Sequence, residues 1–180
     1  GNQFLANIRE TDAIAHVVRC FQDDDVVHVS GRIDQVGDIE IISTELALAD
    51  LETVGRHLHR ATKAAKTGDK EAAARRDLLG RIADHLDGGD PVRSMSLADN
   101  ELKSIRELHL LTVKPTMYVA NVSEDGFSGN PHLDAVRALA DAEGAEVVAV
   151  CAAIEAELIQ LEEDERTVFL EELGLTEPGL

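Results

Sequence analysis

Three short, largely apolar runs constrain the fold of this chain more than any other feature. They cover residues 13–21, 116–120 and 146–150, and segments with helical spacing lie between them. Such runs are typical of strands buried on both faces in parallel sheets. The alternation of strands and helices therefore predicts an α/β fold with a doubly wound, mainly parallel sheet. In such a sheet a ligand binds at the carboxyl ends of the strands.

A long helical segment interrupts this alternation after the first run. From about Ile41 to Lys66, apolar residues are spaced alternately four and three apart, as in a coiled-coil seam: Ala47, Leu51, Val54, Leu58, Ala61 and Ala65. Gly68 can end this helix and Asp69 can cap the next, which predicts an antiparallel helical hairpin. We expect an inserted helical coiled-coil domain at 25–111. Residues 1–24 and 112–180 would form a partial nucleotide-binding domain.

The second apolar run leads into Asn121-Val122-Ser123-Glu124, which resembles the base-recognition motif Asn-Lys-x-Asp of P-loop GTPases. In that motif the Asp carboxylate accepts hydrogen bonds from the two donors on the N1 and N2 edge of guanine. Here Val122 replaces Lys and Glu124 replaces Asp. Adenine lacks both donors, so a carboxylate held in the guanine geometry would be desolvated and unpaired against it. The change therefore indicates ATP rather than GTP.

With its neighbours, this loop resembles the YchF or Obg-like ATPase family of translation-factor-related P-loop NTPases. Further matches cover much of the chain: residues 2–9, 12–14, 16–21, 28–31, 45–51 and 172–175. The resemblance implies a ribosome-associated ATPase with ATP and Mg²⁺ as cofactors and GTP disfavoured.

The resemblance also implies a role for each residue of a base pocket. Asn121 would hydrogen-bond the N7 side of the purine, Val122 would pack near the base, and Glu124 would stand where guanine specificity is set. Three small residues after the third run resemble the Ser-Ala-Lys loop that forms the opposite wall: Cys151, Ala152 and Ala153. None of these residues performs chemistry, so we predict no catalytic residue and no metal ligand in this chain.

The phosphate-binding motifs of the family are missing from the sequence. It has no Gly-x-x-x-x-Gly-Lys-Ser/Thr loop to cradle the phosphates and no Asp-x-x-Gly motif for the magnesium side. Family members carry these motifs upstream of the segment that matches Gly1, and a TGS domain after the segment that matches Leu180. We therefore expect the interior of a larger protein, inactive alone, with its magnesium ligands upstream.

The formal net charge of −18 bears on the partners. An acidic surface repels phosphate backbones, so direct nucleic-acid binding by this segment is not expected. Contact with basic ribosomal proteins would reconcile the charge with a ribosomal partner. No signal peptide opens the chain and no apolar run could span a bilayer, so we expect a cytoplasmic location, no membrane, and reduced Cys20 and Cys151.

Two other hypotheses stay open. The hairpin could act as a non-enzymatic interaction module, with Arg60, Lys63 and Lys66 forming a basic side, although a solvated helix face is the commoner explanation. Alternatively, an exposed sheet edge could cause self-association. The adjacent carboxylates of residues 23–25 predict a solvated turn. His57 and His59, two apart on a helix, do not share a face for one metal ion.

Overall fold

The computed structural model describes residues 2–22, 34–66 and 68–172, which fall into two compact units. One unit comprises residues 1–14 and 40–115, and the other comprises residues 15–39 and 116–180. The domain boundaries expected from the sequence, 25–111 against 1–24 with 112–180, stay a prediction.

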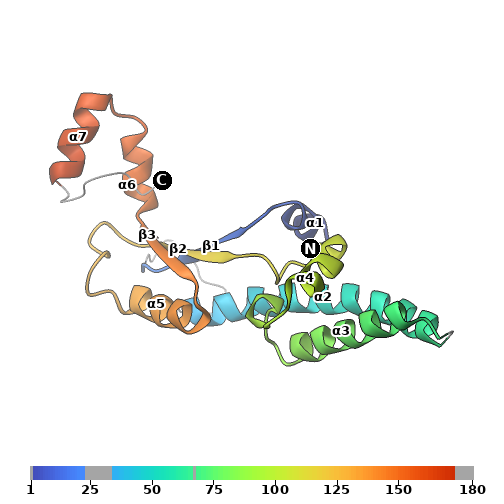
Figure 1. Ribbon diagram of the computed structural model, residues 1–180. Helices are drawn as coiled ribbons and strands as arrows, with labels where there is room; N and C mark the ends of the chain where they lie inside the picture. The colour runs from blue at the N-terminus through green and yellow to red at the C-terminus, as the bar shows by residue number, and fades with distance from the viewer. Residues whose placement is uncertain (1, 23–33, 67, 173–180) are drawn as a thin grey trace. The chain divides into compact units, whose positions relative to one another are not determined.

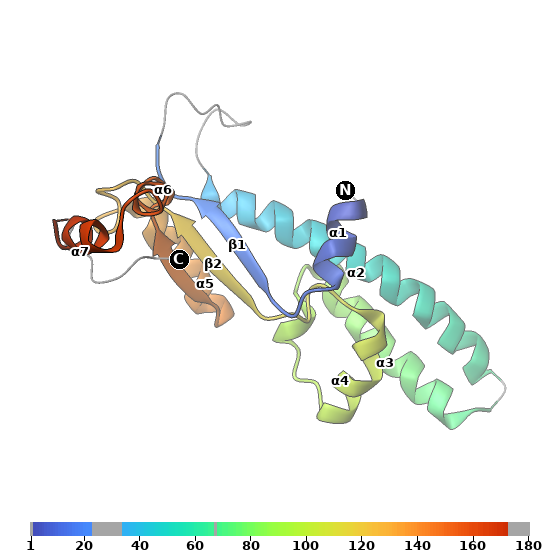
Figure 2. The same ribbon diagram turned by 90° about the horizontal axis from the view of Figure 1, so that it is seen from above.

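The second unit is built on a three-stranded sheet in the order β1-β2-β3. Its strands are β1 (Ile14–Arg19), β2 (Thr116–Asn121) and β3 (Glu146–Val150), close to the three apolar runs. β2 and β3 are parallel, with Asn121 opposite Val150. Just past β1, the backbone N–H of Cys20 donates to the carbonyl of Asn121. The three strand ends therefore lie along one edge of the sheet, and Figure 2 shows β1 and β2 side by side.

Helix α5 (Pro131–Glu143) packs against β2 and β3 (Figure 1). Its buried Leu133, Val136 and Ala140 share one hydrophobic core with residues of the sheet, Tyr118 among them. The sequence predicts a helix over 132–143, with Pro131 able to occupy its first turn, and the helix begins one residue earlier, at Pro131 itself. It ends at Gly144, whose φ of 67° is a conformation that glycine adopts without strain.

The other face of the sheet is more open than the sequence indicates. Successive side chains alternate across a strand, so Val18 lies in the core and Val17 on the opposite face. Val17 is 66 % exposed and Val148 is 38 % exposed. The prediction that the run at 13–21 is buried on both faces is therefore wrong for Val17.

Two short helices follow β3, namely α6 (Ala152–Leu158) and α7 (Glu163–Glu172). Helical spacing in the sequence predicts two short helices at 154–161 and 166–173, and both observed helices begin before these starts. For α6 the reason is a contact across the sheet: the side chain of Asn121 accepts a hydrogen bond from the backbone N–H of Ala152 at 3.0 Å. This bond satisfies an N–H in the first turn, which has no partner within a helix.

The first unit contains the helical hairpin. Its elements are α1 (Asn2–Arg9), most of α2 (Gln35–Ala65), α3 (Lys70–Asp87), α4 (Asp99–Ile105) and the 3₁₀ turns η1 (Val92–Ser94) and η2 (Arg106–Leu108). Figure 2 shows α2 and α3 side by side. The predicted seam is the core of this hairpin, since Ala47, Val54 and Ala61 are buried against Leu79 and Ile82. The predicted α/β class with a helical hairpin is confirmed.

The base of the hairpin is closed by a buried carboxylate. Asp50 on α2 is fully buried and accepts hydrogen bonds from the backbone N–H groups of Leu111 (2.9 Å) and Thr112 (2.7 Å). The hydroxyl of Thr112 donates to the same carboxylate at 2.8 Å, and the guanidinium of Arg9 lies 3.5 Å from it. Asp50 therefore joins α2 to the segment that leaves the hairpin.

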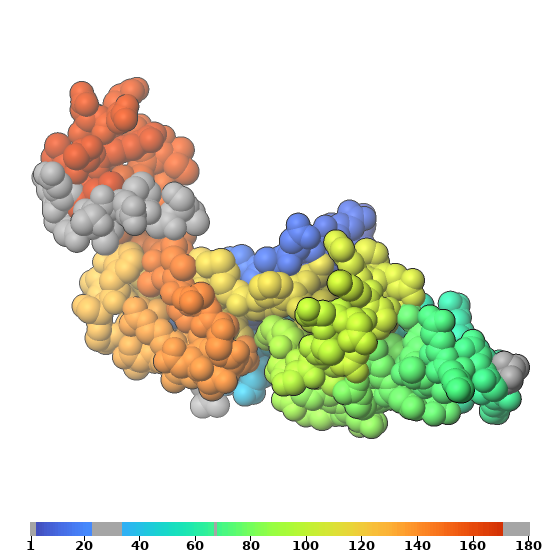
Figure 3. Space-filling model, in the orientation of Figure 1, coloured from blue at the N-terminus to red at the C-terminus, as the bar shows by residue number. Residues whose placement is uncertain are grey.

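Helix α4 packs beside α3, as the space-filling view shows (Figure 3). Arg75 of α3 donates to the carbonyl of Ser104 at 3.0 Å. In the sequence, residues 96–99 resemble a capping box that opens a helix, but in the structure the N-cap residue of α4 is Ala98. The carboxylate of Glu101 accepts from the N–H of Ala98 at 2.9 Å, but the methyl group of Ala98 cannot return a bond.

In the described parts of the chain, we find no helix that combines the length and the apolar composition needed to cross a bilayer. The predicted turn at 23–25 and the matches at 28–31 and 173–175 lie outside the described residues.

Candidate functional site

A cavity of about 570 Å³ lies at the carboxyl ends of the strands in the sheet unit. It is lined by all the residues that the sequence predicts for a base pocket: Asn121, Val122, Glu124, Cys151, Ala152 and Ala153. Phe21, Ser123 and Asp125 complete the lining. The volume falls within the range of small-molecule sites, roughly 300–1,000 Å³. The structure thus brings together two loops that are about thirty residues apart in the sequence.

Asn121 joins the two walls of this cavity. It is the last residue of β2 and is half-buried. Because the N–H of Ala152 donates to the side chain of Asn121, the atom that it meets is the amide oxygen. The amide NH₂ of Asn121 is then the group left to contact a ligand. This wall of the cavity therefore offers a hydrogen-bond donor.

Residues 122–126 form a tight turn below the cavity. The N–H of Val122 donates to the carbonyl of Val150 at 2.8 Å, and the N–H of Gly126 donates to the carbonyl of Ser123 at 2.8 Å. A Cβ atom on Gly126 would lie 2.8 Å from the Ser123 hydroxyl oxygen and 3.0 Å from the Ser123 backbone nitrogen. Any side chain at position 126 would therefore force Ser123 and the turn to shift.

Asn130 holds this turn in place. Its side-chain NH₂ donates to the carbonyls of Cys20 (2.8 Å) and Gly126 (3.0 Å). Its side-chain oxygen accepts from the N–H groups of His132 and Leu133 and so caps α5. The Asn-Pro pair at a helix start could have indicated the cap. No local pattern indicates the bond to Cys20, which lies 110 residues away in the sequence.

Phe21 was also missed by the sequence reasoning. It follows β1 and contributes a half-buried ring to the cavity. The guanidinium carbon of Arg19 lies 4.9 Å from the centre of this ring, and its Nε donates to the carbonyl of Phe21 at 3.1 Å. Its position at the same sheet edge as Asn121 is the signal that could have identified it.

The charge of the lining favours a neutral or donor-bearing group over phosphates. Glu124 and Asp125 are both exposed, and Asp125 accepts a hydrogen bond from the Ser123 hydroxyl at 2.8 Å. No lysine or arginine is among the described residues that line the cavity. The nearby Cys20 thiol adds no charge at neutral pH, because burial raises its pKa to about 11. An anionic phosphate chain placed here would meet carboxylates, whereas a purine base would not carry that cost.

Metal ligands are a separate question. Within residues 2–22, 34–66 and 68–172, no cluster of three or more His, Cys, Asp or Glu side chains could hold a metal ion. We therefore assign no magnesium ligand to these residues.

Three bacterial proteins with the same name are similar to this chain over its whole length. The chain is 57 % identical over 180 residues to the ribosome-binding ATPase YchF of Haemophilus ducreyi and 54 % identical to that of Escherichia coli O157:H7. It is 48 % identical over 183 residues to the ribosome-binding ATPase YchF of Bacillus subtilis. Each match covers the whole chain, and the chain spans about half (50 %) of each of these relatives. A scan against models of protein families matches none of them.

A solved structure agrees with these relatives. The structure of the Schizosaccharomyces pombe YchF GTPase superposes with a TM-score of 0.87 at 30 % sequence identity. The match covers 98 % of this chain and 49 % of that protein. The bacterial relatives are named ATPases and the yeast protein is named a GTPase, so the names leave the preferred nucleotide open.

Proposed function

This chain belongs to the YchF family of Obg-like ATPases, and we propose that it supplies the base-recognition part of a purine-nucleotide site in a ribosome-associated NTPase. The observation that carries the proposal is the bond between Asn121 and Ala152, because it commits the amide oxygen and leaves the NH₂ group for a ligand. The N7 atom of a purine is a hydrogen-bond acceptor, so it can accept a hydrogen bond from this NH₂ group of Asn121. Val122 and the small residues Cys151, Ala152 and Ala153 leave room for a flat base.

We further propose that the site prefers ATP. A carboxylate in this cavity favours the binding of guanine only if it accepts hydrogen bonds from the N1 and N2 donors at the same time. The shorter Asp side chain of the GTPase motif accepts both. Glu124 is one methylene longer and exposed, and it has no hydrogen-bond partner among the described residues, so nothing holds it in that geometry. Magnesium would accompany the triphosphate and be held by residues other than those described here.

Nucleotide binding tests both proposals. We would titrate ATP and GTP, each with magnesium, into this chain and into a longer chain that carries a P-loop segment before the same residues. The longer chain is expected to bind and to prefer ATP. A preference for GTP would refute the role given to Glu124. Tight ATP binding by the 180-residue chain alone would place the site elsewhere, because the described cavity has no group for phosphates.

The substitution Asn121→Asp isolates the role of the amide. The aspartate keeps an oxygen for the N–H of Ala152 but replaces the NH₂ donor with a second acceptor, which repels the purine N7. We expect nucleotide affinity to fall at least tenfold in the longer chain, about 1.4 kcal/mol. Asn100→Asp is the matched control, since Asn100 is exposed and does not line the cavity. Equal effects of the two substitutions would contradict the proposal.

A second role, in which the hairpin docks on the ribosome in the cytoplasm, has one observation in its favour. Arg60, Lys63 and Lys66 are exposed three residues apart, and none has an ion-pair partner among the described residues. Leu51 and Leu58 pack in the hairpin core, so their replacement would disrupt the hairpin itself. The better test is Arg60→Glu with Lys63→Glu. Ribosome binding that is lost in this variant and kept in Asn121→Asp would show that the hairpin carries the contact.

A further inference from the structure

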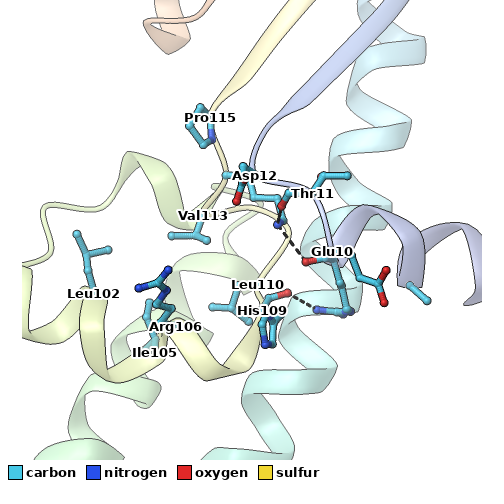
Figure 4. A pocket seen from close by; sticks show the side chains of 13 residues that line it. Glu10, Thr11, Asp12, Leu102, Ile105, Arg106, His109, Leu110, Val113 and Pro115 are labelled. Atoms are coloured by element: carbon cyan, nitrogen blue, oxygen red, sulfur yellow. Dashed lines mark hydrogen bonds between the residues drawn. The ribbon is translucent and has the colours of Figure 1, made fainter.

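A second cavity, of about 860 Å³, lies within the hairpin unit (Figure 4). The end of α1 and the residues after it form one side. The other sides come from α4, η2 and the segment 109–115. Neither the sequence motifs nor the comparisons assign a role to it.

Hydrogen bonds from two side chains, Arg9 and Lys114, connect the residues at the end of α1 with the segment 109–115. Arg9 donates to the carbonyl of His109 at 2.8 Å. Lys114 donates back to the carbonyl of Arg9 at 3.2 Å and also to that of Thr11. His109 is the one described residue other than glycine with a positive φ, 48°, and the bond from Arg9 holds its carbonyl in that conformation. The cavity is therefore preformed.

One part of the lining is apolar. Ile105 and Leu110 are buried at its base, while Val113 is half-buried and Leu102 is 40 % exposed. Pro115 closes this part. In Figure 4 these side chains surround Arg106. An aliphatic group entering the cavity would cover surface that is now in contact with water, and such burial favours binding by about 25 cal/mol per Å².

Two opposite side-chain charges in the lining are available to a ligand. Arg106 and Asp12 both line the cavity, and among the residues that the structure describes neither the Arg106 guanidinium nor the Asp12 carboxylate has a hydrogen-bond or ion-pair partner. Several other arginines of this unit have carboxylate partners, such as Arg75 with Glu107 at 2.6 Å. Glu10 adds a second carboxylate to the lining. The cavity thus presents an available guanidinium, available carboxylates and an apolar surface.

We propose that this cavity binds a free aliphatic α-amino acid in its zwitterionic form. The ligand carboxylate would pair with Arg106, whose planar guanidinium matches two carboxylate oxygens. The ligand ammonium would pair with Asp12, and the aliphatic side chain would contact Leu102 and Val113. Arg9 and Lys114 also line the cavity, but both already donate to backbone carbonyls, so a phosphate would pair mainly with Arg106 while its greater negative charge faces Asp12 and Glu10. A simple fatty acid would leave those carboxylates without a partner.

Three small probes separate these contacts. L-leucine carries both charges, 4-methylpentanoate lacks the ammonium group, and 3-methylbutylamine lacks the carboxylate. Binding would be followed by NMR of methyl-labelled chain, through the methyl signals of Leu102, Ile105 and Val113. Leu133, in the core of the sheet unit, is the internal reference. We expect saturable shifts with L-leucine and at least tenfold weaker binding of each analogue.

Two substitutions assign the charges. Arg106→Gln should weaken L-leucine and 4-methylpentanoate and leave 3-methylbutylamine unchanged, whereas Asp12→Asn should weaken L-leucine and the amine and leave the acid unchanged. Arg60→Gln, on the exposed hairpin, is the control. Both substituted side chains are exposed, and the methyl spectrum of each variant shows directly that it is folded.

Several results would overturn the proposal. One is the absence of saturable L-leucine binding at about 10 mM, a concentration that would fill about 90 % of a site with a Kd of about 1 mM. Another is equal weakening of all three probes by either variant. A leucine-terminated pentapeptide that binds more than tenfold tighter than L-leucine would identify a peptide as the occupant instead of a free amino acid.

Discussion

Replacing Asp50 with alanine should destabilise the hairpin unit by several kcal/mol. The substitution leaves the buried N–H groups of Leu111 and Thr112 without an acceptor. Each unsatisfied buried donor costs about 1–3 kcal/mol, so the sum is about 2–6 kcal/mol. Because small proteins are stable by only about 5–15 kcal/mol, the loss is a large fraction of the total.

Two measurements check this magnitude. Urea unfolding followed by circular dichroism gives the change in the free energy of unfolding. Amide hydrogen exchange locates it: the N–H groups of Leu111 and Thr112 should lose protection, while that of Val119 in β2 should keep it. Asp50→Asn should cost less than Asp50→Ala, because one acceptor oxygen remains.

Glu52→Ala is the matched control on the same helix. Glu52 is exposed and, among the residues described, pairs only with Arg56 at the surface, so its loss should change stability by no more than about 0.5 kcal/mol. If Asp50→Ala costs less than about 1 kcal/mol, or if exchange at Leu111 and Thr112 is unchanged, the assigned role of this carboxylate is wrong.

The remaining predictions concern two titrating groups of the sheet unit. Burial lowers the pKa of His16 below 6.5, against the opposing effect of Asp38 and Glu143. The unfolded chain therefore binds this proton more readily, and stability should fall as the pH drops through 6.5 toward the lowered pKa. His16→Gln should flatten urea midpoints measured between about pH 8 and pH 5, and parallel profiles would contradict this assignment. Burial raises the pKa of Cys20 to about 11, so iodoacetamide at neutral pH should alkylate it slowly until urea unfolds the chain. Fast labelling of the folded chain, read by mass spectrometry of peptides, would be inconsistent with that burial.

The sequence predicts the parts of this structure that depend on local pattern. β3 covers the residues that its apolar run predicts, and α5 begins within one residue of its expected start. Both were predictable because an apolar run, Pro131 and Gly144 are local signals. The hairpin core follows from the seam spacing for the same reason. The residues predicted for a base pocket also line one cavity, since parallel strands bring their carboxyl ends to one edge, while their role in binding a base stays a prediction.

Contacts between distant residues could not be predicted in this way. Asp50 lies in a helix where a carboxylate usually faces water, and its partners come some sixty residues later. The early start of α6 depends on a side chain thirty-one residues upstream. The exposure of Val17 depends on what covers the sheet, which the composition of one strand does not reveal.

The four bonds of Asn130 limit which amino acids can occupy that position. Its side chain gives two bonds to carbonyls and receives two from a helix start, all within 3.3 Å. Aspartate keeps the acceptor and loses both donors, serine is too short to reach both sides, and glutamine moves the amide outward by a methylene. In a saturation library selected for folding, we therefore expect position 130 to tolerate asparagine alone, even though it is not among the residues that line the cavity. A catalogue of tolerated substitutions would single out this residue as strongly as any in the cavity itself.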